Sequence, residues 1–124
     1  MYELICSSHF DSAHHLVGYA GKCQFPHGHT FLYRVAIQGD KLDKLGILID
    51  FTVIKEAMRT YIDDQLDHQD LNLVGPFGAR NPTAENLARF IFQTLQLALL
   101  SVEDIRVAWV EVWESEKCGV RYWE

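Results

Sequence analysis

Strand-like segments at both ends of this chain enclose two helix-like segments, and this order restricts the folds that 124 residues can adopt. Apolar and polar residues alternate over residues 2–14, and a second strand pattern covers about residues 27–38. β-branched and aromatic residues return over residues 102–113, and a short last strand is expected over residues 119–123. The order ββααββ predicts an α+β fold, with two helices on one face of a four-stranded antiparallel sheet.

The two predicted helices lie in the middle of the chain. Asp50 suits the N-cap of a helix over about residues 51–65. The second helix is expected to begin near Asn81-Pro82-Thr83, because Asn or Thr suits the cap and Pro suits the first turn. Apolar residues recur at helical spacing in both: Phe51, Ile54, Met58, Tyr61 and Ile62 in the first, and Leu87, Phe90, Ile91, Leu95 and Ala98 in the second.

Composition excludes several classes of protein. The formal net charge is −6, from 17 acidic and 11 basic residues, which argues against a nucleic-acid-binding surface. No apolar stretch reaches the roughly 20 residues that span a bilayer, and the N-terminus lacks the pattern of a secretory signal. The three cysteines form no CxxC pair, so a disulfide framework is not expected. We therefore expect a single domain over residues 1–124 in the reducing cytoplasm, without a nucleic-acid or membrane partner.

The tripeptide His27-Gly28-His29 is the most informative motif. Residues i and i+2 of a strand point to the same face, so these two imidazoles would project side by side. A catalytic zinc site with an open position needs a third histidine, and His14 or His15 at the end of the first strand would supply it. An HxH pair by itself also fits chance or solvent exposure. It occurs in cupin-like barrels as well, but the Glu that usually follows it there is missing here.

A cysteine and an Asp-His pair are candidates for proton transfer. Cys23 lies beside Lys22 in a loop expected over residues 16–26, and a thiol near a metal and a lysine can be held partly as a thiolate. Such a thiolate could act as a base. Asp67 and His68 follow the first predicted helix and would complete a Cys–His–Asp relay. The alternative for His68 is an interaction with the helix dipole.

A carboxylate near the end of the third strand is a candidate ligand anchor. Glu114 follows Val110 and Val112 on one strand face, where an unpaired carboxylate is unfavourable. Adjacent N–H donors, such as the guanidine-like edge of a pterin or guanine, would satisfy it with two parallel hydrogen bonds. The alternative is that Glu114 already lies beyond the strand, in solvent. For Trp109 and Trp113, core packing is expected rather than a subunit contact.

An ordered set of motifs resembles the 6-pyruvoyl-tetrahydropterin synthase family over nearly the whole chain. The motifs are Phe10-Asp11-Ser12-Ala13-His14, Cys23-Gln24-Phe25-Pro26-His27-Gly28-His29, Asp50-Phe51, Leu66-Asp67-His68, Asn81-Pro82-Thr83-Ala84-Glu85-Asn86 and Trp113-Glu114-Ser115. The Cys-x3-His-Gly-His spacing is similar to the bacterial branch of this family, the 6-carboxytetrahydropterin synthases of queuosine biosynthesis. His15 stands where the family often carries Arg.

The resemblance implies a T-fold in which three subunits form a barrel and two trimers stack as a homohexamer, with sites at subunit interfaces. It implies Zn2+ held by three histidines, a cysteine base with an Asp-His relay, a carboxylate that anchors the pterin, and further pocket residues. These are His14, His27 and His29 for the metal, Cys23, Asp67 and His68 for proton transfer, Glu114 for the pterin, and Thr83 and Glu85 in the pocket.

The implied reaction converts 7,8-dihydroneopterin triphosphate to 6-carboxytetrahydropterin, with release of acetaldehyde and triphosphate. A 6-pyruvoyltetrahydropterin synthase, or another lyase of the pterin side chain, would use the same site. A non-catalytic metal-binding assembly module remains the alternative from a different class, but simple binding needs neither Cys23 nor the Asp67-His68 pair.

Overall fold

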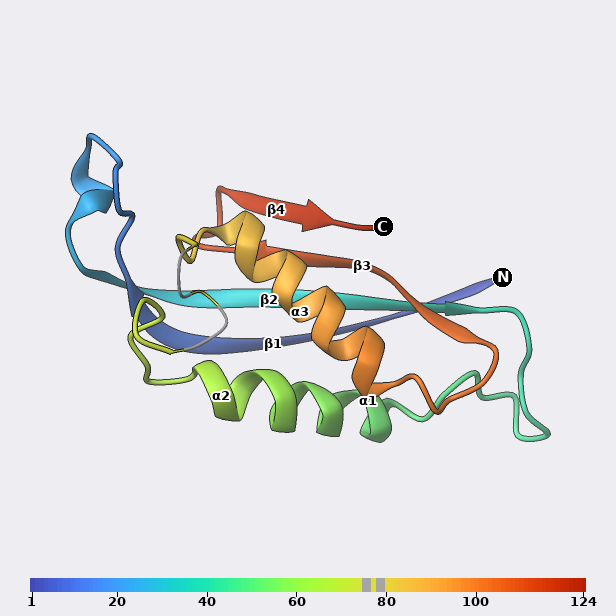
Figure 1. Cartoon of the computed structure of the whole chain (residues 1–124). Coiled ribbons are helices and arrows are strands. Elements are labelled where there is room, and N and C mark those ends of the chain that lie inside the picture. The colour runs from blue at the N-terminus through green and yellow to red at the C-terminus, as the bar shows by residue number, and fades with distance from the viewer. Residues whose placement is uncertain (75–76, 78–79) are drawn as a thin grey trace.

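The computed structural model describes residues 1–74, 77 and 80–124. Within them, four strands form one antiparallel sheet in the order β1-β2-β3-β4, and the helices cover one of its faces (Figure 1). The strands are β1 (Tyr2–His14), β2 (His27–Gly39), β3 (Ile105–Trp113) and β4 (Gly119–Tyr122). The helices are α1 (Phe51–Met58), α2 (Asp64–Leu66) and α3 (Ala84–Ala98). The predicted α+β class and the order ββααββ are confirmed.

The pairing of β1 with β2 sets the core. Phe10 lies opposite Phe31 in this antiparallel ladder, and their rings stack with centroids 5.2 Å apart. Both side chains are fully buried beneath the helices, which explains the alternating pattern of the two strands. The same alternation continues to the end of the ladder, where His14 lies opposite His27. The strand ends therefore carry polar side chains on the helix-covered face.

Side-chain caps begin both main helices where the sequence predicts them. The carboxylate of Asp50 accepts a hydrogen bond from the Thr52 N–H at 2.8 Å, and the Thr83 hydroxyl accepts one from the Asn86 N–H at 3.2 Å. The predicted apolar face of α3 is buried or partly buried throughout. The first helix differs, because Phe51 and Tyr61 are each about half exposed. None of the helices in these described ranges is long and apolar enough to cross a membrane.

The predicted helix over residues 51–65 is not uniform. Arg59–Asp63 form a π-helical turn, η2, between α1 and α2. In this turn the Asp63 carboxylate accepts hydrogen bonds from the Tyr33 and Ser8 hydroxyls, each at 2.7 Å. Tyr33 is fully buried, so its hydroxyl needs a partner inside the protein. Burial and Asp63 raise the pKa of Tyr33 far above its ordinary value, so the hydroxyl stays a donor.

The helix-free face of the sheet carries a charged ladder between two tryptophans. Arg34, Glu111 and Arg121 lie opposite one another on β2, β3 and β4. Arg121 Nη2 donates to Glu111 at 2.6 Å, and its guanidinium lies 4.2 Å from the Trp109 ring centroid. Trp113 Nε1 also donates to Glu111, at 3.1 Å. The prediction that both tryptophans pack in the core is wrong, because they alternate with Val110 and Val112, which occupy it.

The negative charge of the buried Glu111 is compensated by its neighbours. Burial alone would raise the pKa of this carboxyl, but hydrogen bonds from Arg121 and Trp113 outweigh it and hold the pKa below its ordinary value. Arg34, 3.5 Å away, acts in the same direction. Glu111 is thus a structural anion that the sequence pattern does not identify.

Candidate metal centre and active site

Three histidines converge at the end of the β1–β2 ladder. His14, His27 and His29 bring one ligand atom each to within 4.8 Å of one another. Their ring centroids are 4.6 Å apart for His14 and His27, 5.1 Å for His14 and His29, and 4.8 Å for His27 and His29. The strand register produces this cluster, and it selects His14 rather than its neighbour His15.

Backbone carbonyls orient two of these rings. His14 Nδ1 lies 2.7 Å from the Pro82 carbonyl oxygen, and His27 Nδ1 lies 2.7 Å from that of Phe25. A carbonyl can only accept, so each Nδ1 carries the proton and each Nε2 keeps a free lone pair. This is the arrangement that metal-bound histidines adopt. The backbone carbonyl of Pro82 is thus part of the site, although its residue type gives no sign of this role.

Two ring nitrogens of the cluster lack hydrogen-bond partners among the described residues. The Nε2 atoms of His27 and His29 are buried and make no hydrogen bond with any described residue. Burial lowers the pKa of His29, and the opposing effect of Glu114 does not cancel this, so the neutral, metal-binding form is favoured. Buried polar atoms without partners are unfavourable, and three converging imidazoles are a donor set that suits zinc. The residues present therefore fit a divalent metal.

Glu114 lies next to this cluster. It is one residue beyond β3, its side chain is 35% exposed, and its Oε1 is 3.9 Å from His14 Nε2. It lines a pocket of about 590 Å³ together with Thr30, Arg34 and Trp113. Glu114 thus lies beyond the strand but beside the histidine cluster, and its role as a ligand anchor stays a prediction.

Asp67 and His68 form a hydrogen-bonded pair directly after α2. His68 Nδ1 lies 2.8 Å from one carboxylate oxygen of Asp67, and the other oxygen accepts the Asp11 N–H at 2.9 Å. His68 adopts a positive φ of 55°, unusual for a residue other than glycine. These bonds raise the pKa of His68 and, led by the Asp11 N–H, lower the pKa of Asp67. The predicted Asp–His pairing is present.

The segment that carries this pair runs along the edge of β1. The His68 N–H donates to the Asp11 carbonyl at 2.6 Å, the Ala13 N–H to Gln69 at 3.0 Å, and the Leu71 N–H to Ala13 at 2.8 Å. Asp11 also accepts a hydrogen bond from the Thr30 hydroxyl at 2.5 Å, so it links the segment to β2. Asp11 was not among the predicted site residues, because its hydrogen bonds with Asp67 and His68 are made by its backbone N–H and carbonyl, which residue type does not reveal.

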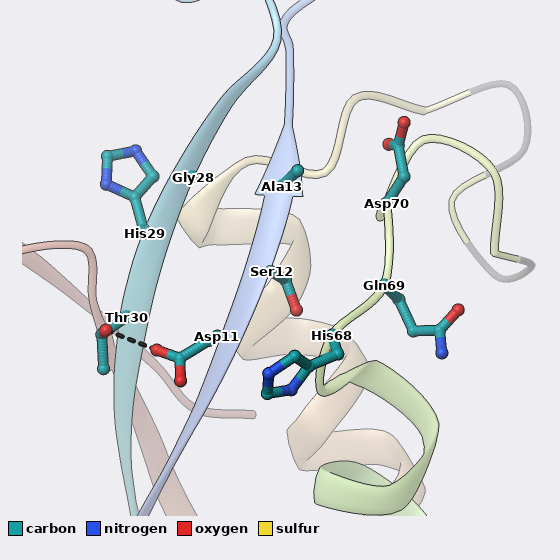
Figure 2. Close-up of a pocket in the computed structure, with 9 residues that line it drawn as sticks. All are labelled: Asp11, Ser12, Ala13, Gly28, His29, Thr30, His68, Gln69 and Asp70. Carbon is teal, nitrogen blue, oxygen red and sulfur yellow. Dashed lines mark hydrogen bonds between the residues drawn. The ribbon is translucent and has the colours of Figure 1, made fainter.

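Figure 2 shows the His68 ring beside Asp11, while the His29 ring points away on the other side of β2. Both residues border an open pocket of about 610 Å³. Within one chain, the rings of His68 and His29 therefore do not point toward each other.

Three further predicted site residues, Cys23, Thr83 and Glu85, also lie outside the histidine cluster. Cys23 is half-buried in the 3-10 turn η1 (Lys22–Gln24), and it is not a member of the metal-ligand group found among the described residues. Thr83 caps α3, and Glu85 is exposed in the first turn of that helix. The roles of these three residues toward substrate remain predictions.

Replacement of Asp67 with asparagine, Asp67→Asn, is expected to lower the pKa of His68 toward about 6.5, because the carboxylate that stabilises the imidazolium is removed. A raised folded pKa stabilises the protein below the unfolded pKa, and this stabilisation disappears as pH rises through the folded value. The variant should lose that part of the pH dependence. NMR titration of the His68 ring measures the shift, and an unchanged pKa would contradict the assigned pairing.

Comparison with known proteins agrees with this geometry. The family profile described as 6-pyruvoyl tetrahydropterin synthase matches residues 3–124. A 6-carboxy-5,6,7,8-tetrahydropterin synthase of Rickettsia felis is 33% identical, covering 90% of this chain and 92% of the relative. The Haemophilus influenzae protein of the same name is 30% identical over the full length of both chains.

A solved structure of 6-pyruvoyl tetrahydropterin synthase from Caenorhabditis elegans superposes with a TM-score of 0.86 at 23% identity, covering 99% of this chain and 95% of that one. This similarity supports the fold. The sequence match over almost the whole chain goes further: the chain belongs to the 6-pyruvoyl tetrahydropterin synthase family.

Proposed function

We propose that this chain is a metal-dependent lyase of the pterin side chain, and that its product is 6-carboxytetrahydropterin. The observation that carries the metal part is the convergence of His14, His27 and His29, in which the buried Nε2 atoms of His27 and His29 make no hydrogen bond with any described residue. The substrate proposal rests on the family and on the names of relatives that share about a third of their residues with this chain. The cysteine-to-histidine spacing and the bacterial relatives favour the carboxy product over the pyruvoyl one, with queuosine biosynthesis as the setting.

The site residues divide the chemistry among them. A zinc ion held by the three histidines would act as a Lewis acid that polarises a side-chain oxygen of the substrate and acidifies the adjacent C–H. Cys23 removes that proton, since a thiolate is a stronger base than neutral side chains of this site. His68, whose pKa is raised by the hydrogen bond and the charge of Asp67, returns one with Asp67 as its partner. Glu114 holds the pterin through two parallel hydrogen bonds.

We further propose that neighbouring subunits complete each site. The described sheet has outer strands β1 and β4, which are open to pairing with other chains, as a trimeric barrel and a stacked homohexamer require. Within one chain the His68 ring lies beside Asp11, while the His29 ring points away on the other side of β2 (Figure 2). A site that draws its histidines and Cys23 from one chain and its Asp–His pair from a neighbouring chain accounts for this separation.

Replacement of Glu114 with glutamine, Glu114→Gln, is expected to weaken pterin binding roughly ten- to hundredfold, because one of two charge-assisted hydrogen bonds is lost. Isothermal titration with a non-reacting pterin measures this effect. Glu103→Gln, a change at an exposed glutamate that does not line this pocket, serves as the matched control. Wild-type affinity in Glu114→Gln would remove Glu114 as the anchor.

The product decides between the candidate functions. The metal-loaded protein is incubated with 7,8-dihydroneopterin triphosphate, and the products are identified by mass spectrometry. The proposal expects 6-carboxytetrahydropterin, acetaldehyde and triphosphate. A pyruvoyl product would instead assign the activity named for the Drosophila melanogaster relative, which is 34% identical over 86 residues. An unchanged substrate would favour a binding module.

A further inference from the structure

Two asparagine side chains hold the backbone that leaves β1. Asn72 accepts the His15 N–H at 2.9 Å and donates to the His15 carbonyl at 3.0 Å. Asn81 does the same for Val17, at 2.8 Å and 2.9 Å. A carboxamide offers one acceptor and a donor group, so it can pair with both backbone groups of one residue as a neighbouring strand would. We call these four hydrogen bonds the asparagine clamp.

The clamp lies at the base of the loop that carries Cys23. Between the two clamped residues, the Leu16 N–H donates to the Cys23 carbonyl at 2.7 Å, which closes the loop. Beyond this closure the loop and η1 stand out from the end of the sheet, as the blue segment of Figure 1 shows. Val17 and Tyr19 are mostly exposed, so little packing holds the loop itself. Its position therefore depends on the hydrogen bonds at its base.

Both clamp residues are themselves fixed to the proposed active site. Asn81 precedes Pro82, whose carbonyl orients His14, and the Asn86 side chain donates to the Asn81 carbonyl at 2.8 Å. Asn72 ends the segment that runs along β1 from Asp67, and its N–H donates to Asp70 at 3.0 Å. The clamp thus connects the Cys23 loop to the metal centre on one side and to the Asp–His segment on the other.

We infer that Asn72 and Asn81 are positioning residues, which set the place of Cys23 relative to the histidine cluster. The catalytic meaning of this inference rests on the proposed function, whereas the hold on the loop rests on the hydrogen bonds alone. Neither asparagine needs to touch substrate for this role. Removing either carboxamide leaves two backbone groups of the loop base without partners, and the loop then opens more often.

The test compares Asn72→Ala and Asn81→Ala with Leu73→Ala, a change at an exposed neighbour of Asn72. Hydrogen exchange by mass spectrometry follows the segment from His15 to Gln24, and peptide-resolved alkylation follows Cys23 separately from the buried Cys6 and the exposed Cys118. Each clamp variant is expected to exchange this segment, and to alkylate Cys23, roughly tenfold faster. We expect kcat to fall roughly tenfold with KM nearly unchanged, and metal content to stay at the wild-type level in Asn72→Ala.

The outcomes separate the clamp from the reaction. Wild-type exchange and alkylation rates in both clamp variants would overturn the inference, and so would a rise in KM equal to the fall in kcat, which would indicate general damage to the pocket. Faster exchange and alkylation without any lyase activity in the unmodified protein would support the clamp and reject the proposed function.

Discussion

The variant His27→Ala is expected to bind zinc at least about a hundredfold more weakly than the wild type and to lose its lyase activity. Loss of a residue that only orients a ligand already weakens metal affinity 10- to 100-fold, and this change removes a ligand itself. The β1–β2 ladder holds His14 and His29 independently of His27, so the fold should persist. Metal analysis after dialysis measures the effect, with circular dichroism as the check on folding.

The exposed His9 on β1 provides the matched control for this variant. His9→Ala removes an imidazole from the same strand but from outside the cluster, and it should retain stoichiometric zinc. Full zinc occupancy in His27→Ala would show that the imidazole of His27 is not a ligand, and the metal centre would have to be rebuilt from other residues.

The variant Cys23→Ala is expected to keep its fold and its zinc but to lose turnover by a factor of roughly 10² to 10⁴, the usual contribution of a general base. Cys23 is half-buried in η1 and belongs to neither the apolar core nor the metal-ligand group. Its removal should therefore change the free energy of unfolding little. Single-turnover kinetics with the triphosphate substrate measure the loss.

Cys118→Ala is the companion to this experiment. Cys118 is an exposed thiol between β3 and β4, and its loss should leave turnover unchanged. If Cys23→Ala turns over substrate within about threefold of the wild type, another group must remove the proton, and the proposed relay through Asp67 and His68 would lose its starting point.

Strand alternation was sufficient to predict the centre of the site. Because side chains two apart share a face, His27 and His29 had to project together, and an antiparallel partner strand had to bring a third histidine beside them. Strand alternation alone left His14 and His15 open as alternatives, and the family resemblance implied His14. The register of β1 against β2, which depends on the packing of Phe10 on Phe31, decides between them.

Features that depend on backbone groups escaped prediction. A carbonyl such as that of Pro82 orients His14, but every residue has a carbonyl, so residue type carries no information about it. The π-helical turn η2 was missed because Ile54, Met58 and Ile62 keep helical spacing across it, and all three are buried. In this turn Asp63 accepts a hydrogen bond from the hydroxyl of Tyr33, which is distant in sequence, so the contact could not be predicted from local spacing.

The tryptophans show a different limit of sequence reasoning. Size and apolar character favour burial in a core, so Trp109 and Trp113 were assigned there. The helix-free face also offers them stable surroundings, because Arg121 stacks on Trp109 and Glu111 accepts the Trp113 N–H. Contacts with side chains of β3 and β4 stabilise both tryptophans on the helix-free face. Such contacts can be predicted only when the strand register is known.

The hydrogen bonds of residues 67–72 to β1 have a consequence for self-association. An outer strand normally exposes its whole length as a template for sheet growth. Here the carboxyl-terminal portion, from Asp11 to His15, is already capped by the chain's own backbone and by Asn72. On β1, a foreign strand can therefore pair only with the portion that precedes Asp11, so the chain's own hydrogen bonds set where a strand added at this edge must end.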